Sequence, residues 1–215
     1  MRPVTVTVGP LATASANNIC TSQTPTTSFI LNGTLVSNGV ATPDTPRRVL
    51  FTTAANESAK TVTLTGTDYN RSPITEVLAL TNVGISQTVL DFKTITAITI
   101  SAAATGAITV GTSTVASSMW VRLDEYALPQ TSIQVTVSGV VNYTVQQTLQ
   151  DPNSPTDPVL PYQVVWVNSA DPAVVASSAT AQSNYTYAPA WAKVTLNSGT
   201  GSLSAVFTQA GNAPY

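Results

Sequence analysis

The acidic side chains are the first candidates for chemistry, because two carboxylates held at a suitable separation can hydrolyse a glycosidic bond. Asp124 and Glu125 are neighbours in the chain. Adjacent residues of a strand point to opposite faces of the sheet, so these two carboxylates cannot act together on one substrate. We interpret them as solvated charges of a linker between domains.

Three more aspartates, Asp151, Asp157 and Asp171, are each followed by proline. Aspartate in such a turn commonly bonds its own backbone. A calcium site is an alternative, but the spacing does not match an EF-hand loop. The sequence therefore predicts structural turns here, with no catalytic, cofactor or metal site.

The chain has no histidine and a single cysteine, Cys20. These counts leave no ordinary zinc ligand set, no Ser-His-Asp triad and no internal disulfide. The 8 basic and 10 acidic residues give a net charge of −2, and Arg47-Arg48 is the one adjacent basic pair. Phosphate binding needs clustered Lys and Arg. We therefore expect no enzyme, no small-molecule substrate and no nucleic-acid partner.

Aromatic rings could instead form a stacking platform for sugars. Trp120 and Trp166 stand within Val-rich segments, which predicts burial in the core. Tyr185 and Tyr187 share one face of a predicted strand beside a proline turn, and Trp191 follows it. Tyr185, Tyr187 and Trp191 are therefore the candidate contacts with a partner.

The elements that must position these residues are strands. Thr, Ser, Val and Ala are abundant and Leu, Glu and Lys are scarce, a composition that favours β-structure over helix. Alternation of apolar and polar residues predicts strands over 4–8, 29–31, 48–52, 60–65, 75–80, 94–101, 107–110, 119–123, 132–137, 140–149, 162–167, 192–196 and 202–207.

These strands predict an all-β fold of two tandem antiparallel β-sandwiches, immunoglobulin-like or jelly-roll-like. We expect one domain over 1–125, with an extended arm over about 1–27 that orders in an assembly, and a second over 126–215. The boundary is placed near Glu125 to Pro129.

Several local features can be predicted as well. Asn197 to Gly201 reads as the turn of a hairpin, and Gly66 to Pro73 as another. A phase change at Ala97 predicts a β-bulge. The proline-rich stretch 151–161 is expected to be an exposed loop, and Asp171-Pro172 to open a single helical turn.

We expect neither a signal peptide nor a membrane span. Residues 4–8 alternate, whereas a signal peptide has a continuous apolar core after its basic start. The weakly charged stretch 94–121 is interrupted by Thr, Ser and Gly, and so lacks the roughly 20 mostly apolar residues of a transmembrane helix.

The low charged fraction, 8%, also suits assembly. Hydroxyl-rich surfaces lose little side-chain entropy on burial and offer donors and acceptors across a contact. A free monomer normally carries more charge, which keeps it soluble and protects its sheet edges. We therefore expect the hydroxyl-rich faces to be covered by copies of the chain or by other proteins, with charged residues at rims and loops.

The chain resembles tailed-bacteriophage virion structural proteins with tandem β-sandwich domains. The segments that carry this resemblance cover most of the chain: 46–53, 63–68, 91–101, 108–112, 137–146 and 193–201. The resemblance implies a structural component of the particle with no transferable catalytic residues.

The function expected on these grounds is a non-enzymatic virion protein, made in the host cytoplasm. It would dock in multiple copies on the capsid surface, as a decoration protein, or at the head–tail junction. Its expected partners are copies of itself and other capsid, neck or tail proteins. The alternative is a receptor- or carbohydrate-binding appendage module that uses Tyr185, Tyr187 and Trp191 with the loop 151–161.

Overall fold

A computed structural model describes residues 3–124, 130–187 and 189–209. The protein is all-β, as predicted, with antiparallel strands in three sheets. The described residues contain no α-helix, and their helical structure is limited to two short 3-10 turns, η1 (Pro161–Gln163) and η2 (Pro172–Val174). No helix in the described part of the chain is long and apolar enough to cross a membrane.

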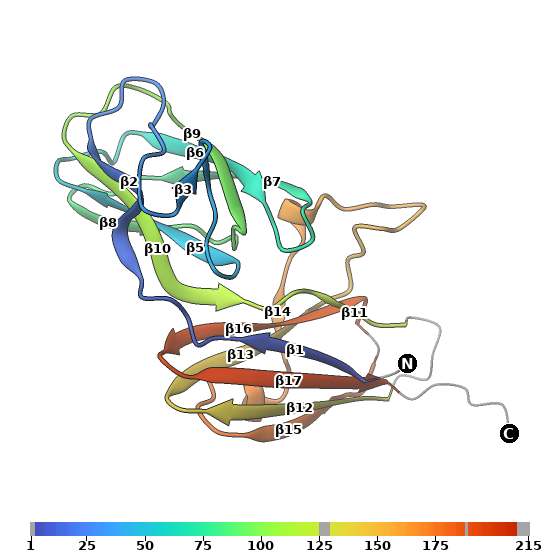
Figure 1. The fold of residues 1–215 in the computed structure, drawn as a ribbon. Helices are drawn as coiled ribbons and strands as arrows, with labels where there is room; N and C mark the ends of the chain where they lie inside the picture. The colour runs from blue at the N-terminus through green and yellow to red at the C-terminus, as the bar shows by residue number, and fades with distance from the viewer. Residues whose placement is uncertain (1–2, 125–129, 188, 210–215) are drawn as a thin grey trace, which may run out of the picture. The chain divides into compact units, whose positions relative to one another are not determined.

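The chain folds into two compact units (Figure 1). The first unit comprises Met1–Leu11 and Ser117–Tyr215, and the second comprises Ala12–Ala116. The predicted boundary at 125–129 lies outside the described residues, and the domains 1–125 and 126–215 stay a prediction. The stretch expected to be an arm contains two paired strands, β1 in the first unit and β2 in the second.

In the first unit, four strands form a sheet in the order β1 (Val4–Val8), β17 (Ser202–Gln209), β12 (Thr131–Ser138) and β15 (Ala181–Tyr185). They lie side by side in Figure 1. The remaining strands pair separately: β13 (Val141–Thr148) with β14 (Val167–Asn168) and β16 (Trp191–Gly199), and β16 also with β11 (Val121–Arg122).

Buried and exposed residues alternate along the strands of the four-stranded sheet, so one face of this sheet contributes to the core of the first unit. Val6 and Val8 of β1, Ile133 and Val135 of β12 and Phe207 of β17 are buried. The residues between them point the other way and are mostly polar. Burial of one face therefore fixes the register, because a slip by one residue would expose every apolar side chain.

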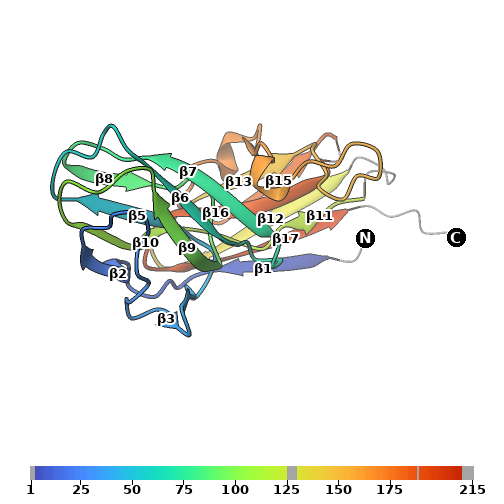
Figure 2. The ribbon, with the colours of Figure 1, turned by 90° about the horizontal axis from the view of Figure 1, so that it is seen from above.

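In the second unit, one sheet has the order β3 (Val36–Ser37), β4 (Val40–Ala41), β9 (Thr94–Ile100), β6 (Thr61–Thr67) and β7 (Pro73–Ala79). In addition, β10 (Ile108–Ser117) pairs with β2 (Ser15–Gln23) and with β5 (Arg47–Thr53), which pairs with β8 (Gly84–Gln87). Figure 2 shows these strands from above. The core they enclose contains Ile19, Phe29, Val49, Phe51, Val62, Leu64, Phe92, Ile95, Ile98, Ile108 and Val110.

The bulge predicted at Ala97 is confirmed. Thr65 pairs with Ala97 but the next residue, Gly66, pairs with Ile95, so Thr96 and Ala97 together oppose one position of β6. Both are exposed, which lets Ile95 and Ile98 point into the core. Gly66 permits the close approach, because a Cβ there would lie 1.9 Å from the Thr94 carbonyl oxygen.

Three local predictions are wrong. Residues 29–31 and 162–167 are not strands, apart from the start of β14 at Val167. The turn over 197–201 does not close a hairpin, because β16 pairs with β13 whereas β17 pairs with β1 and β12. The predicted hairpin of β6 and β7 is confirmed, with Thr67 opposite Pro73.

Candidate functional site

One face of the four-stranded sheet of the first unit carries no charged residue in the described strands. Its outward side chains belong to Thr5, Thr7, Ser132, Gln134, Thr136, Ser138, Gln182, Asn184, Ser202, Ser204, Val206 and Thr208. We call these residues the hydroxyl face. The described charged residues of the unit lie on loops or on β11 and β16, namely Arg122, Asp124, Asp151, Asp157, Asp171 and Lys193.

The hydroxyl face is hollowed into an open groove of about 530 Å³. It is lined by Ser132, Ile133, Gln134, Asp171, Gln182, Ser183, Asn184, Val206 and Thr208. The strand register brings these residues together: Ser132 pairs with both Asn184 and Thr208, and Gln134 pairs with both Gln182 and Val206.

Asp171 contributes the carboxylate of the groove. As predicted, it caps a single turn: its Oδ1 accepts the Ala173 amide N–H at 2.9 Å at the start of η2. The Ala173 amide and the Ser183 hydroxyl lower the pKa of this half-buried carboxyl. Asp171 is therefore ionised at neutral pH and acts only as an acceptor.

The three tryptophans form a separate cluster in the first unit. The centroid of the Trp120 ring lies 4.9 Å from that of Trp166 and 6.1 Å from that of Trp191, and both ring pairs are arranged edge to face. Two cations flank the rings: Arg122 lies 5.9 Å from the Trp191 ring centroid and Lys193 lies 4.8 Å from that of Trp166. Trp120 and Trp166 are half-buried rather than core residues.

Asp151 ties the loop 151–161 to this cluster. Its carboxylate accepts the Trp191 indole N–H at 2.9 Å and the Asn153 amide at 2.9 Å, and lies 3.2 Å from Arg122. Burial alone would raise the pKa of Asp151, but these three partners together lower it. The cluster therefore anchors the start of a loop that has little regular structure of its own.

We expect Asp151→Ala to loosen this loop. The lost hydrogen bonds are worth about 1–2 kcal/mol, which corresponds to roughly 5–30-fold more frequent local opening. Limited proteolysis of the folded protein should show cleavage within 151–161 accelerated by that factor. Asp157→Ala, in the same loop but with an exposed side chain, should leave the rate unchanged. Equal rates for wild type and Asp151→Ala would contradict the anchoring role.

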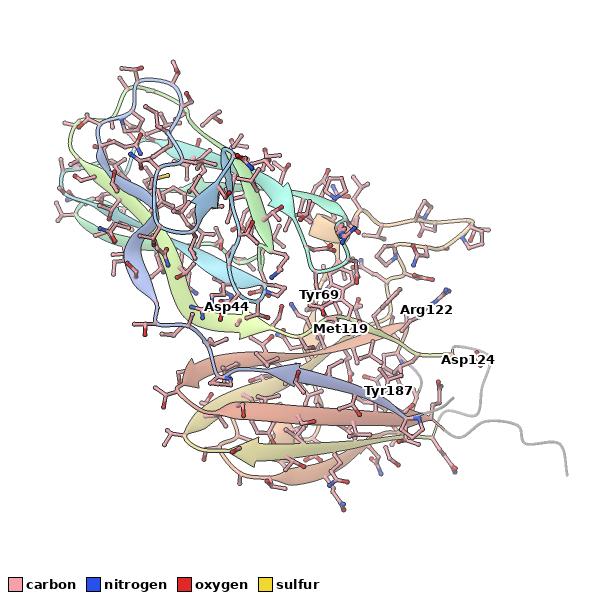
Figure 3. The ribbon with its side chains drawn as sticks, in the orientation of Figure 1. Asp44, Tyr69, Met119, Arg122, Asp124 and Tyr187 are labelled. Atoms are coloured by element: carbon pink, nitrogen blue, oxygen red, sulfur yellow. The ribbon has the colours of Figure 1, made fainter. Side chains whose placement is uncertain are left out.

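The three predicted partner contacts differ in exposure. Tyr185 is only 4% exposed, whereas Tyr187 is 43% exposed and its hydroxyl bonds the Gln147 side-chain amide. Trp191 is half-buried in the cluster. Met119, Arg122 and Tyr187 lie at the end of the unit where β11 runs (Figure 3). A role of Tyr185, Tyr187 and Trp191 as contacts stays a prediction.

The other residues considered for chemistry are dispersed. The Asp124 backbone is held by the Gln209 side chain at 2.7 and 2.8 Å, and Glu125 lies outside the described residues. Cys20 is fully buried, which raises the pKa of its thiol to about 12. No group of three or more Cys, Asp or Glu side chains in the described ranges could hold a metal ion.

A second surface of interest lies on the second unit, at the edges of β7 and β8. Val77 is 65% exposed and Ile85 61%, and Val83 and Val89 are similarly exposed. We call these four residues the apolar edge. Glu76 brings Val89 against β7, because its carboxylate accepts the amide N–H groups of Val89 and Leu90 at 2.8 Å each.

Neither the groove nor the apolar edge was predicted from the sequence. The groove combines residues of β12, β15 and β17, which are far apart in the chain, with Asp171 from a loop, and most of its lining residues are ordinary polar positions in the sequence. The apolar edge could have been suspected from Val77 and Ile85, which are apolar at strand positions where polar residues are expected.

No family model, curated protein or solved structure matches the chain.

Proposed function

We propose that the chain is a non-enzymatic structural protein of a tailed-bacteriophage virion, which docks in multiple copies on the capsid surface or at the head–tail junction. The observation that carries this proposal is the apolar edge. Exposed β-branched side chains at a sheet edge are rare in monomers, which usually protect their edges with charges.

The edge has the features of a strand-addition site. Among the described residues, β7 pairs only with β6 and β8 only with β5, so the far side of each strand is unpaired. The exposed positions of β7 are Pro73, Thr75, Val77 and Ala79, and none is charged. A strand added to such an edge would form main-chain hydrogen bonds with it, and contacts with the side chains of the edge would make the binding specific. We propose a β-strand of another virion protein as the occupant.

We further propose that the two units are two β-sandwich domains. In the second unit the five-stranded sheet on one side and the strands β2, β5 and β10 on the other contribute residues to one core. In the first unit, one face of the four-stranded sheet is buried while the other is the hydroxyl face. Two layers around a core in each unit support this arrangement.

The proposal can be tested by incorporation into particles. Tagged chain is expressed in the infected host, virions are purified on a density gradient, and bound chain is quantified. Wild type should co-purify with virions, and Val77→Lys with Ile85→Lys should reduce incorporation at least 10-fold, because buried lysines would be unpaired. Exposed substitutions of this kind change stability by about 0.5 kcal/mol or less, so the fold should persist.

Ala102→Lys with Ala103→Lys adds the same two charges at exposed positions of the second unit outside the apolar edge, and should leave incorporation unchanged. Wild-type incorporation of the Val77→Lys, Ile85→Lys variant would refute docking at the apolar edge. Absence of the wild-type chain from virions would refute the virion role itself.

A further inference from the structure

The groove on the hydroxyl face presents a grid of hydrogen-bonding groups. Two rows cross β17, β12 and β15: Thr208, Ser132 and Asn184 in one, and Val206, Gln134 and Gln182 in the other. Neighbouring strands are about 4.8 Å apart, and residues two apart on a strand are about 6.7 Å apart. The grid thus offers closely spaced polar groups on a rigid sheet rather than on a mobile loop.

The chemistry of these groups is both donating and accepting. The carboxamides of Gln134, Gln182 and Asn184 each provide an acceptor oxygen and two donor N–H groups, and the hydroxyls of Ser132 and Thr208 do both. A ligand hydroxyl also donates and accepts, so it can bond such groups in pairs. The Asp171 carboxylate adds a stronger acceptor at the border of the groove.

The lining also disfavours other ligand classes. Among the described residues, no Lys or Arg lines the groove and the Asp171 carboxylate is its one charged group, so a phosphate, sulfate or carboxylate ligand would be repelled without compensation. The described lining also holds no aromatic ring, so a flat hydrophobic ligand would find little apolar surface beyond Val206. The volume, about 530 Å³, lies within the range of roughly 300–1,000 Å³ typical of ligand sites.

We infer that this groove binds an uncharged saccharide through its hydroxyl groups. Gln134, Gln182 and Asn184 form the hydrogen-bonding floor, Val206 packs against the C–H groups of a sugar ring, and Asp171 accepts from sugar hydroxyls. The site is distinct from the aromatic residues Tyr187 and Trp191 and does not depend on the virion role proposed above.

The test is titration of the full chain, isotope-labelled for NMR, with three neutral trisaccharides: maltotriose, cellotriose and N,N′,N″-triacetylchitotriose. At least one should shift the amide resonances of β12, β15 and β17 with a Kd of about 0.1–10 mM, as expected for an open site that relies on hydrogen bonds. Tri-galacturonic acid, an anionic trisaccharide, should bind at least 10-fold more weakly than the best neutral one.

Gln134→Ala and Asn184→Ala should each weaken binding by about 5–30-fold, the loss of one or two hydrogen bonds. Thr136→Ala is the matched control, because Thr136 lies on the same face of β12 but does not line the groove. It should leave the Kd unchanged, as should Tyr187→Ala.

Three results would overturn the inference. One is no shift with any of the neutral trisaccharides at concentrations up to about 20 mM, where a site of the expected affinity would be well occupied. Another is binding that is lost in Tyr187→Ala and retained in both groove variants. The third is equal binding of tri-galacturonic acid.

Discussion

Replacing Asp44 by Ala is expected to lower the free energy of unfolding of the second unit by about 3 kcal/mol, because it leaves a buried cation without its counter-ion. The Arg47 guanidinium is only 1% exposed. Its Nε lies 2.7 Å from Asp44 Oδ1 and its Nη2 lies 2.8 Å from Asp44 Oδ2. Asp44 also accepts the Ala12 amide N–H at 2.8 Å, and Arg47 donates to the Ala12 carbonyl at 2.6 Å.

Urea unfolding followed by circular dichroism measures this loss. The double variant Asp44→Ala, Arg47→Met is the control, because it removes the buried charge as well as its partner. It should recover much of the stability that Asp44→Ala loses. A loss below about 1 kcal/mol for Asp44→Ala, or a double variant less stable than it, would contradict the account of this pair.

Glu57→Gln is expected to cost about 3 kcal/mol at pH 7, and the cost should diminish in acid. Glu57 is 1% exposed and accepts from the Thr105 and Gly106 amides at 2.8 Å each, and from Lys60 Nζ at 2.5 Å. Burial alone would raise the pKa of Glu57, but Lys60 and the two amides outweigh it and lower the pKa below its ordinary value of 4.5.

The lowered pKa sets the sign of the pH dependence. A carboxyl group with a folded-state pKa below its unfolded value stabilises the fold above the unfolded pKa, and this contribution is lost as the pH falls through the folded pKa. The difference in unfolding free energy between wild type and Glu57→Gln should therefore be constant from pH 7 to about 5 and shrink below about pH 4.5.

Glu76→Gln provides the opposite case in the same unit. Burial raises the pKa of Glu76, and the amides of Val89 and Leu90 only partly offset this. The ionised form is therefore disfavoured in the fold. The free energy of unfolding of wild type should rise relative to that of Glu76→Gln as the pH is lowered. Urea unfolding at pH 7, 5 and 3.5 separates the two trends, and the same trend for both variants would refute the assignment.

The sequence predicted the elements whose register is set by alternating burial. The strands over 4–8, 94–101 and 202–207 and the bulge at Ala97 follow from which positions can point inward, which is a local property. Strand β2 was missed because one of its polar residues, Asn18, is buried against a partner distant in the chain. Asn18 donates to Thr112 Oγ1 at 2.7 Å and accepts the Thr112 amide at 3.0 Å, so its amide is satisfied inside the unit.

Candidate sites were harder to predict, because they depend on pairing between distant strands. From the sequence, Trp120 and Trp166 were predicted to be core residues of strands. In the structure β11 spans only two residues and 161–163 form a 3-10 turn, so neither ring lies within a strand and both contribute to the half-buried tryptophan cluster. Ser132, Asn184 and Thr208 become neighbours only through the order β17, β12, β15. No local sequence pattern predicts this order of strands in the sheet.

We propose above that this chain is a structural component of a virion, so it must be present in mature particles. Quantitative mass spectrometry of purified, mature virions tests it most directly. We expect the chain at a fixed copy number per particle, in the hundreds for capsid decoration or six or twelve for the head–tail junction. Its absence from mature virions, with clear detection in the infected cell, would rule out a structural role in the virion.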